Sequence, residues 1–273
     1  MVRRILLASD GSASAKGAEA LAEWLGYELE AQLVGLFVRD SRWIRLPEFL
    51  DLGALSLPLP AYHQEIEQAL TVKGEGILGR LEDAARMAGV NFARQLETGV
   101  PAEVIVQEAR TADLVVLGRQ GENHPEGQVL GSTAERVVRA SPVPVLLAPP
   151  AYTRPERLLI GYNGSEPAVR ALHFAAPLAV GLGLGVRVLS VDDTPSRAED
   201  LAREGAEYLA AYGLKAEPVA LQGDPAERLL ELQGAADLLA LGAFGGGPVR
   251  RWLLGSTTEY VLRSSPAAVL VVR

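Results

Sequence analysis

The sequence contains no cysteine, only three lysines and no long apolar run. Without cysteine the chain has no disulfides, no thiolate chemistry and no cysteine metal ligands, and a cytoplasmic location is the default expectation. The longest nearly uncharged stretch, residues 174–186, is too short to span a bilayer and is interrupted by proline and glycine. The apolar run at the N-terminus ends at Ser9, so we expect neither a signal peptide nor a membrane segment.

Acidic residues outnumber basic ones, 34 to 26. The net charge is −8, which argues against a protein that binds nucleic acid by neutralising phosphates. Hydrophobic residues make up 48% of the chain and charged residues 22%, a balance typical of folded globular proteins. The histidines His63, His124 and His173 are not spaced as metal ligands, so we predict no metal site formed by the protein alone.

The sequence does contain an internal repeat, and the predicted fold follows from it. Residues 9–12 (SDGS) recur 153 positions later as residues 162–165 (YNGS), and residues 131–133 (GST) recur 124 positions later as residues 255–257. The order of the matching blocks is preserved, so the change of offset places a 29-residue insertion in the first copy, within about residues 39–63. We predict two domains, copy one (residues 1–150) and copy two (residues 151–273), joined by a proline-rich linker.

Each copy alternates short apolar runs with stretches of helical periodicity. In copy one the predicted strands are residues 5–9, 33–38, 91–96, 114–118 and 143–148, and the predicted helices include residues 12–25, 65–88, 102–110 and 132–139. Strands that are continuously apolar are typical of a parallel sheet covered on both faces. The predicted fold is therefore α/β, with two tandem doubly wound five-stranded parallel sheets whose ligands bind beyond the carboxyl ends of the strands.

A glycine pattern follows the fourth predicted strand of each copy. Two glycines three positions apart are followed, after nine residues, by Gly-Ser-Thr: Gly118, Gly121 and Gly131-Ser132-Thr133 in copy one, and Gly242, Gly245 and Gly255-Ser256-Thr257 in copy two. We expect the first glycine to admit a ligand to the backbone and the second to adopt a positive φ, so that successive N–H groups converge on an anion. Gly-Ser-Thr opens a predicted helix, whose first N–H groups lack partners and attract phosphate. The alternative is that the glycines only form turns and the serine only caps a helix.

These glycine loops, together with residues 10–12 (DGS) and 99–101 (GVP), resemble the ATP-binding subgroup of the universal stress protein family over nearly the whole chain. The resemblance implies an adenine nucleotide α-hydrolase-like, Rossmann-like fold with ATP as ligand and Mg²⁺ held through the ATP phosphates. It also implies that the last strands of the two copies pair, which in one chain makes an intramolecular pseudo-dimer. Further association into a homodimer is left open.

The resemblance also implies roles for individual residues. Val38 and Val191 would present backbone groups to adenine, and Ala8, Asp10, Gly161 and Asn163 would line the base and ribose. The glycine loops would hold the ribose and phosphates, through Gly118, Arg119, Gly121, Gly131, Ser132 and Thr133 in copy one and Gly242, Gly245, Gly255, Ser256 and Thr257 in copy two. Copy two departs from the family in having Asn163 in place of an aspartate. Copy one departs in having Glu122 and Glu126 in its loop, where Arg250 and Arg251 lie in copy two.

The predicted function is that of an ATP-binding stress-response protein, whose nucleotide occupancy sets its stability or its affinity for a protein partner that the sequence does not identify. The alternative is a scaffold that keeps the fold but has lost nucleotide binding in one or both copies. No general base is evident, so we predict a binding protein rather than an enzyme and leave slow hydrolysis of ATP open. None of the lysines, Lys16, Lys73 and Lys215, lies in a glycine loop, which argues against a P-loop NTPase.

Two further segments need an interpretation. The insertion is rich in Leu and Pro, and we expect a loop that packs over the sheet or onto a partner, with a lid over the first nucleotide as the alternative. Residues 74–79 form a literal GxGxxG, but they lie inside the predicted helix 65–88 with no strand before them, so a dinucleotide site is excluded.

Overall fold

The computed structural model describes residues 1–44, 59–122, 130–243 and 255–273. Its ten strands form one sheet in the order β3-β2-β1-β4-β5-β10-β9-β6-β7-β8. The strands of copy one are β1 (Arg4–Ala8), β2 (Gln32–Asp40), β3 (Phe92–Gly99), β4 (Leu114–Gly118) and β5 (Val145–Ala148). Those of copy two are β6 (Arg157–Gly161), β7 (Gly185–Val191), β8 (Ala216–Leu221), β9 (Asp237–Gly242) and β10 (Ala268–Val272). All pairings within a copy are parallel, so the predicted pair of doubly wound five-stranded sheets is confirmed.

Helices cover both faces of the sheet, which is why its central strands are apolar throughout. Alternate residues of a strand enter different cores: Ile5 and Leu7 pack with α1 (Lys16–Glu28) and α6 (Glu166–Leu182), whereas Leu6 packs on the opposite face. The first core also receives α3 (Leu59–Met87) and α7 (Pro195–Ala210), and the second receives α4 (Pro101–Glu108), α5 (Ser132–Ala140), α8 (Pro225–Leu232) and α9 (Ser256–Ser264). Short 3₁₀ turns, η1 (Ala13–Ala15) and η2 (Ala109–Thr111), complete these connections. Within the described ranges no helix combines the length and apolar character that crossing a bilayer requires.

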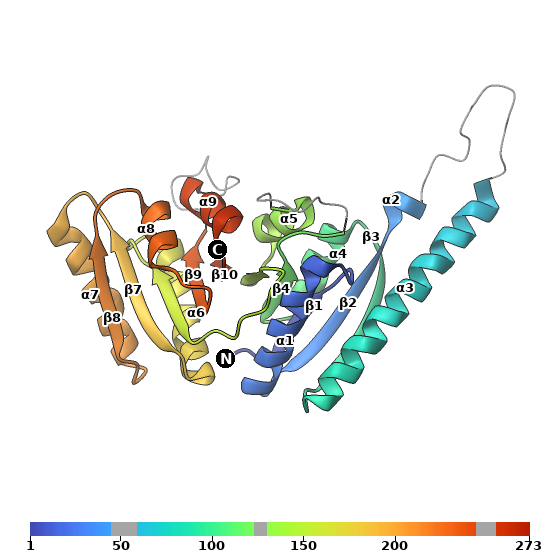
Figure 1. Cartoon of the computed structure of the whole chain (residues 1–273), viewed down its shortest axis with the longest axis horizontal. Coiled ribbons are helices and arrows are strands. Elements are labelled where there is room, and N and C mark those ends of the chain that lie inside the picture. Colours follow the sequence, from blue (N-terminus) through green and yellow to red (C-terminus); the bar gives the residue numbers. More distant parts are fainter. Residues whose placement is uncertain (45–58, 123–129, 244–254) are drawn as a thin grey trace, which may run out of the picture.

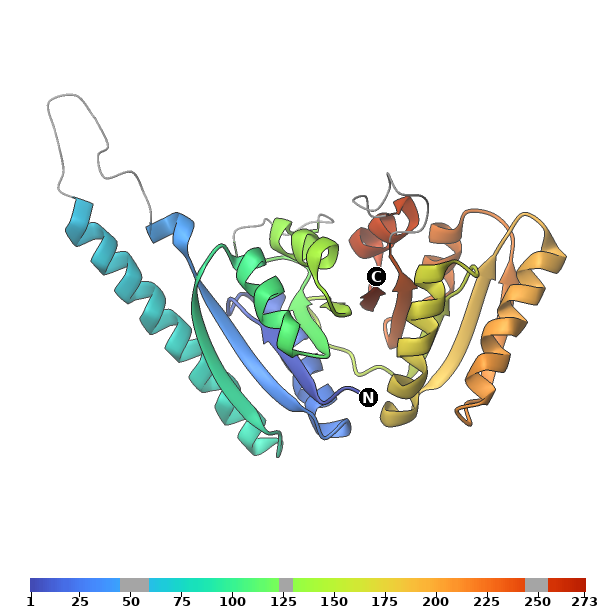
Figure 2. The same ribbon diagram turned by 180° about the vertical axis from the view of Figure 1, so that it is seen from behind.

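The two copies are joined through their last strands. β5 and β10 pair antiparallel, with Leu146 opposite Leu270, and this pairing makes the two five-stranded sheets continuous. Each apolar core contains residues of both copies, so the junction is packed like the interior of one domain. Figures 1 and 2 show the resulting arrangement, with α3 and α7 at opposite ends of the molecule. The intramolecular pseudo-dimer expected from the sequence is present.

The insertion of copy one is partly helical, contrary to the expectation of a loop. After β2 the chain forms α2 (Ser41–Ile44), and α3 then begins at Leu59, so its first turns belong to the inserted residues. Figure 1 shows α2 and the start of α3 beyond the carboxyl end of β2. Residues 45–58 lie outside the described part of the chain, and the lid and packing hypotheses for them stay predictions.

The GxGxxG segment is part of α3, as its sequence context indicated. A Cβ on Gly74 would lie 2.6 Å from the Phe37 ring and 2.7 Å from Leu96, so this glycine lets α3 approach β2 and β3 closely. Of the three glycines in the motif, Gly74 therefore serves helix packing.

Candidate functional site

One cavity of about 570 Å³ opens at the carboxyl ends of β1, β2 and β4. This is the edge where a doubly wound sheet binds ligands. Residues far apart in the sequence meet there, and eight of the nine copy-one residues predicted to hold nucleotide line the cavity: Ala8, Asp10, Val38, Gly118, Gly121, Gly131, Ser132 and Thr133.

The first glycine loop (residues 118–133) is tightly packed at two of its described glycines. A Cβ on Gly118 would lie 2.7 Å from the Ser14 carbonyl oxygen, and one on Gly131 would lie 3.0 Å from the Arg119 carbonyl oxygen. The loop closes on itself through a hydrogen bond from the Gly131 N–H to that same oxygen, at 2.8 Å. These glycines therefore let the two ends of the loop pack closely on each other and on the segment after β1.

Gly121 differs from the sequence expectation. Its φ lies outside the left-handed region, so the predicted turn of positive φ is wrong at this position. A Cβ there would instead lie 2.9 Å from the Asp10 carboxylate. A side chain here would displace the Asp10 carboxylate, while a positive φ is found instead at Gly11, with φ of 75°.

The N-terminus of α5 faces the same cavity. Gly131 is the N-cap, with extended backbone angles (φ −64°, ψ 144°) and no side chain that could accept a hydrogen bond from the first turn. Ser132 and Thr133 follow directly and line the cavity. Unsatisfied N–H groups and the positive end of the helix dipole are features that suit an anion.

Asp10 connects the loop after β1 to the first glycine loop. One carboxylate oxygen accepts a hydrogen bond from the Ser12 N–H at 3.0 Å, and the other accepts from the Glu122 N–H at 2.8 Å. The Glu122 side chain is paired in turn with Lys73 Nζ of α3, at 2.5 Å. The acidic residue that distinguishes the first glycine loop is thus neutralised by a lysine that sequence reasoning did not place in the site.

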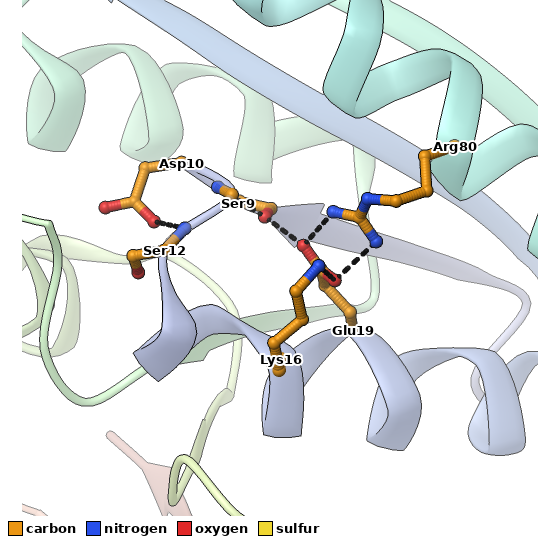
Figure 3. A network of polar contacts seen from close by, with 7 residues as sticks. Ser9, Asp10, Ser12, Lys16, Glu19 and Arg80 are labelled. Atoms are coloured by element: carbon orange, nitrogen blue, oxygen red, sulfur yellow. Dashed lines mark hydrogen bonds and ion pairs between the residues drawn. The ribbon is translucent and has the colours of Figure 1, made fainter.

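A buried polar network supports the loop that carries Asp10 (Figure 3). Glu19 of α1 is 6% exposed and accepts hydrogen bonds from Ser9 Oγ at 2.7 Å, from both terminal nitrogens of Arg80 at 2.8 Å and from Lys16 at 3.1 Å. The Ser9 hydroxyl also accepts from the Gly11 N–H, at 3.1 Å. Burial raises the pKa of Glu19, but the hydrogen bonds from Arg80, Ser9 and Lys16 together outweigh burial and leave that pKa below its usual value. A charged Glu19 therefore holds Ser9, and through it the turn at Gly11.

Arg119 is the predicted site residue that the structure places elsewhere. Its guanidinium turns away from the cavity and donates to the carbonyl oxygens of Ser265 and Ala267 in copy two. Burial lowers the pKa of Arg119 to about 10. Its backbone belongs to the first glycine loop, but its side chain belongs to the junction between copies, because the antiparallel β5–β10 pairing brings the turn before β10 within reach.

The cavity also has a wall that sequence reasoning missed. It consists of residues around the insertion: Asp40, Arg42, Trp43, Leu70 and Lys73. Burial raises the pKa of Asp40, but side-chain and backbone hydrogen bonds from Arg42 outweigh burial and lower that pKa overall. The three-residue spacing of Leu70 and Lys73 on a predicted helix was a signal that both face one side.

In copy two the described residues have a similar arrangement. Gly161 and Val191 end β6 and β7, and Asn163 Oδ1 accepts a hydrogen bond from the Ser165 N–H at 3.1 Å, as Asp10 does from Ser12. Gly255 caps α9, which begins with Ser256 and Thr257. A Cβ on Gly242 would lie 2.3 Å from the Pro167 carbonyl carbon. Gly245, Arg250 and Arg251 lie outside the described residues, as does His124 of copy one.

Copy two replaces the buried network with a different pair. Tyr162 stands at the position of Ser9, and Glu204 at the position of Arg80. The Tyr162 hydroxyl donates to Glu204, and burial, with this carboxylate beside it, raises the pKa of Tyr162 to about 12. The two copies therefore support the same loop with unlike chemistry.

No group of three or more His, Cys, Asp or Glu residues suited to a metal ion occurs in the described part of the chain. The charged residues of the cavity, Asp10, Asp40, Arg42, Lys73 and Glu122, are instead arranged in pairs or on backbone N–H groups.

Comparison with known proteins gives a consistent result. The model of the universal stress protein family matches residues 1–149 and 155–273. Universal stress protein Slr1230 of Synechocystis sp. is 27% identical, with 100% of both chains covered, and universal stress protein Rv2319c of Mycobacterium tuberculosis is 29% identical over 77% of this chain and 80% of its own length. The crystal structure of a universal stress protein from Archaeoglobus fulgidus superposes with a TM-score of 0.75 at 24% identity, covering 99% of this chain and 98% of that one. The chain belongs to the universal stress protein family, with one family unit in each copy.

Proposed function

We propose that copy one binds ATP in the cavity at the carboxyl ends of β1, β2 and β4. The observation that carries this proposal is the convergence of the Asp10 loop, the first glycine loop and the N-terminus of α5 on one space. A triphosphate would lie against Gly118, Gly131 and the first N–H groups of α5, which line the cavity together.

The opposite part of the cavity suits a purine. Its lining there includes Leu36, Val38, Pro101 and Ile105, whose apolar surfaces can cover a flat ring. The end of β2 at Val38 would offer backbone groups to the edge of the base. Copy two would bind a second nucleotide in the same manner, with the Asn163 amide taking the place of the Asp10 carboxylate.

The charge of the cavity favours ATP accompanied by Mg²⁺. Among the described lining residues, Asp10, Asp40 and Glu122 are acidic, whereas Arg42 and Lys73 are basic. A bare triphosphate beside Asp10 would meet a like charge, and Mg²⁺ on the phosphates would relieve this repulsion. Asp10 is the residue whose carboxylate could take part in holding that ion.

We propose binding rather than turnover as the activity. ATP that binds only the folded chain stabilises it by RT ln(1 + [L]/Kd), about 2.7 kcal/mol at a hundred times Kd. Nucleotide level would then set the stability of the chain, or its affinity for a partner, during stress.

The test is a thermal shift measured with Mg-ATP, AMP and GTP. A rise in melting temperature of roughly 5–10 °C with saturating Mg-ATP is expected. Mass spectrometry of the small molecule that co-purifies would identify the natural ligand, and assay of ADP release would detect hydrolysis. An unmoved melting temperature at millimolar Mg-ATP would favour the scaffold hypothesis.

A further inference from the structure

The first glycine loop lacks a lysine of its own, yet a lysine reaches it from α3. Lys73 lines the cavity, and its Nζ lies 2.5 Å from Glu122 Oε2. Glu122 directly follows Gly121, and its own N–H is bound to Asp10. The ammonium group therefore lies beside the first glycine loop and lines the same cavity as Gly118 and Gly131, which we propose hold phosphate.

Arg42, the other cationic side chain in this wall of the cavity, is already paired with a carboxylate. Arg42 donates from Nε and Nη2 to both carboxylate oxygens of Asp40, in a fork of two parallel contacts at 2.9 and 2.5 Å. This is the strong, directional form of an ion pair. Lys73 makes a single contact with a side chain that is 56% exposed. Exposed pairs of this kind are weak, so a better anion can replace the carboxylate at little cost.

The repeat provides a second observation. The residue 124 positions after Lys73 is Arg197, which lies in the first turns of α7. Arg197 pairs with Asp192, which directly follows β7, at 3.4 Å. Both copies therefore carry a cation at the same position of the repeat, on α3 and α7, although the surrounding side chains have diverged.

We propose that Lys73 is a phosphate ligand of the copy-one site and that Glu122 is an internal competitor, which holds the ammonium until a nucleotide phosphate replaces its carboxylate. This inference rests on the proposed binding of ATP. A lysine is a compact charge suited to phosphate, and the exchange leaves it paired with an anion before and after binding. Lys73 would thereby make the site select for phosphate chains over the nucleoside alone.

The test compares Lys73→Met, Lys73→Arg and Glu122→Gln with the wild type, using labelling by 8-azido-ATP and peptide mapping so that copy one is counted separately. Competition by ATP and by adenosine gives their affinities. Lys73→Met should weaken ATP binding about tenfold or more and leave adenosine unchanged, because it removes a charge that only phosphate meets. Lys73→Arg should retain most of the affinity. Glu122→Gln should tighten ATP binding severalfold, because it removes the competitor.

Lys215→Met, an exposed lysine before β8, is the matched control for loss of one positive charge, and its ATP affinity should equal that of the wild type. If Lys73→Met binds ATP as the wild type does, or loses ATP and adenosine equally, Lys73 is not a phosphate ligand. If Glu122→Gln weakens ATP binding, the competitor role is overturned. A wild-type copy one that takes no label with Mg²⁺ present would refute ATP binding itself, which is a separate result.

Discussion

Glu19 is the residue whose replacement tests the support of the candidate site most directly. Its carboxylate receives hydrogen bonds from Ser9, Arg80 and Lys16, and it is 6% exposed. Glu19→Gln keeps the size and one acceptor oxygen but removes the charge. The Arg80 and Lys16 side chains are 43% and 50% exposed, so solvent screening reduces what each contributes.

The expected magnitude follows from that comparison. A hydrogen bond to a charged group contributes about 1.5–3 kcal/mol when buried, and an exposed ion pair about 0–1 kcal/mol. Losing the charge while retaining an acceptor for Ser9 should therefore lower the free energy of unfolding by about 1–2 kcal/mol. For a chain of this size that is a fall in melting temperature of about 2–8 °C.

The pH dependence gives the sharper assay. The folded-state pKa of Glu19 lies below its ordinary value of 4.5, so its stabilisation is present above pH 4.5 and is lost as pH falls through the folded-state pKa. Urea unfolding of the wild type and Glu19→Gln should differ at pH 6–8, and the difference should shrink below about pH 4.5. Glu207→Gln, an exposed change on α7, is the charge-matched control. Equal urea midpoints for wild type and Glu19→Gln at pH 7, or a difference that persists at pH 3, would refute the reasoning.

Two further predictions concern the glycines and the junction. Gly118→Ala and Gly242→Ala should each lower the free energy of unfolding by about 1–3 kcal/mol, because the added Cβ meets backbone at 2.7 and 2.3 Å. Gly76→Ala, on an open face of α3, is the control and should not destabilise the chain. Urea titration measures all three, and a Gly242→Ala chain as stable as Gly76→Ala would contradict the packing. Arg119→Ala should cost about 1–3 kcal/mol by leaving two buried carbonyl groups without their donor, and Arg119→Met, which loses the same charge and hydrogen bonds, should cost less because it fills space that alanine leaves empty. Variants as stable as the wild type in the same titration would show that these hydrogen bonds do not stabilise the junction.

The strands were predictable because burial on both faces demands continuous apolar runs. The run 114–118 matches β4 residue for residue, whereas β2 extends to Asp40, since its pairing with β3 continues as far as Gly99. The helical part of the insertion was missed, although Pro60 gave a signal, because proline is favoured in the first turn of a helix such as α3.

The parts of the candidate site that the backbone forms were predictable from the sequence. The side chains that enter the cavity were less predictable. Gly118 and Gly131 occupy the places that the glycine pattern required. Arg119 was assigned to phosphate from its neighbours in sequence, but the packing between copies decides which way its side chain turns. Lys73 and Trp43 enter the cavity through the placement of α2 and α3, which no local pattern specifies.

The pairing of β5 with β10 has a consequence for how the two halves can change. When identical subunits meet across a two-fold axis, every substitution appears twice, and each new contact must also be possible at the symmetry-related position. A fused chain is free of that condition. Arg119 reaches across to Ser265, while the residue at its equivalent position is Ala243, and no symmetric pair could make this one-sided contact. Tyr162 with Glu204 in copy two, and Ser9 with Glu19 in copy one, show the same freedom beneath the two loops, so the two halves can be tuned to unlike ligands while they share a single sheet.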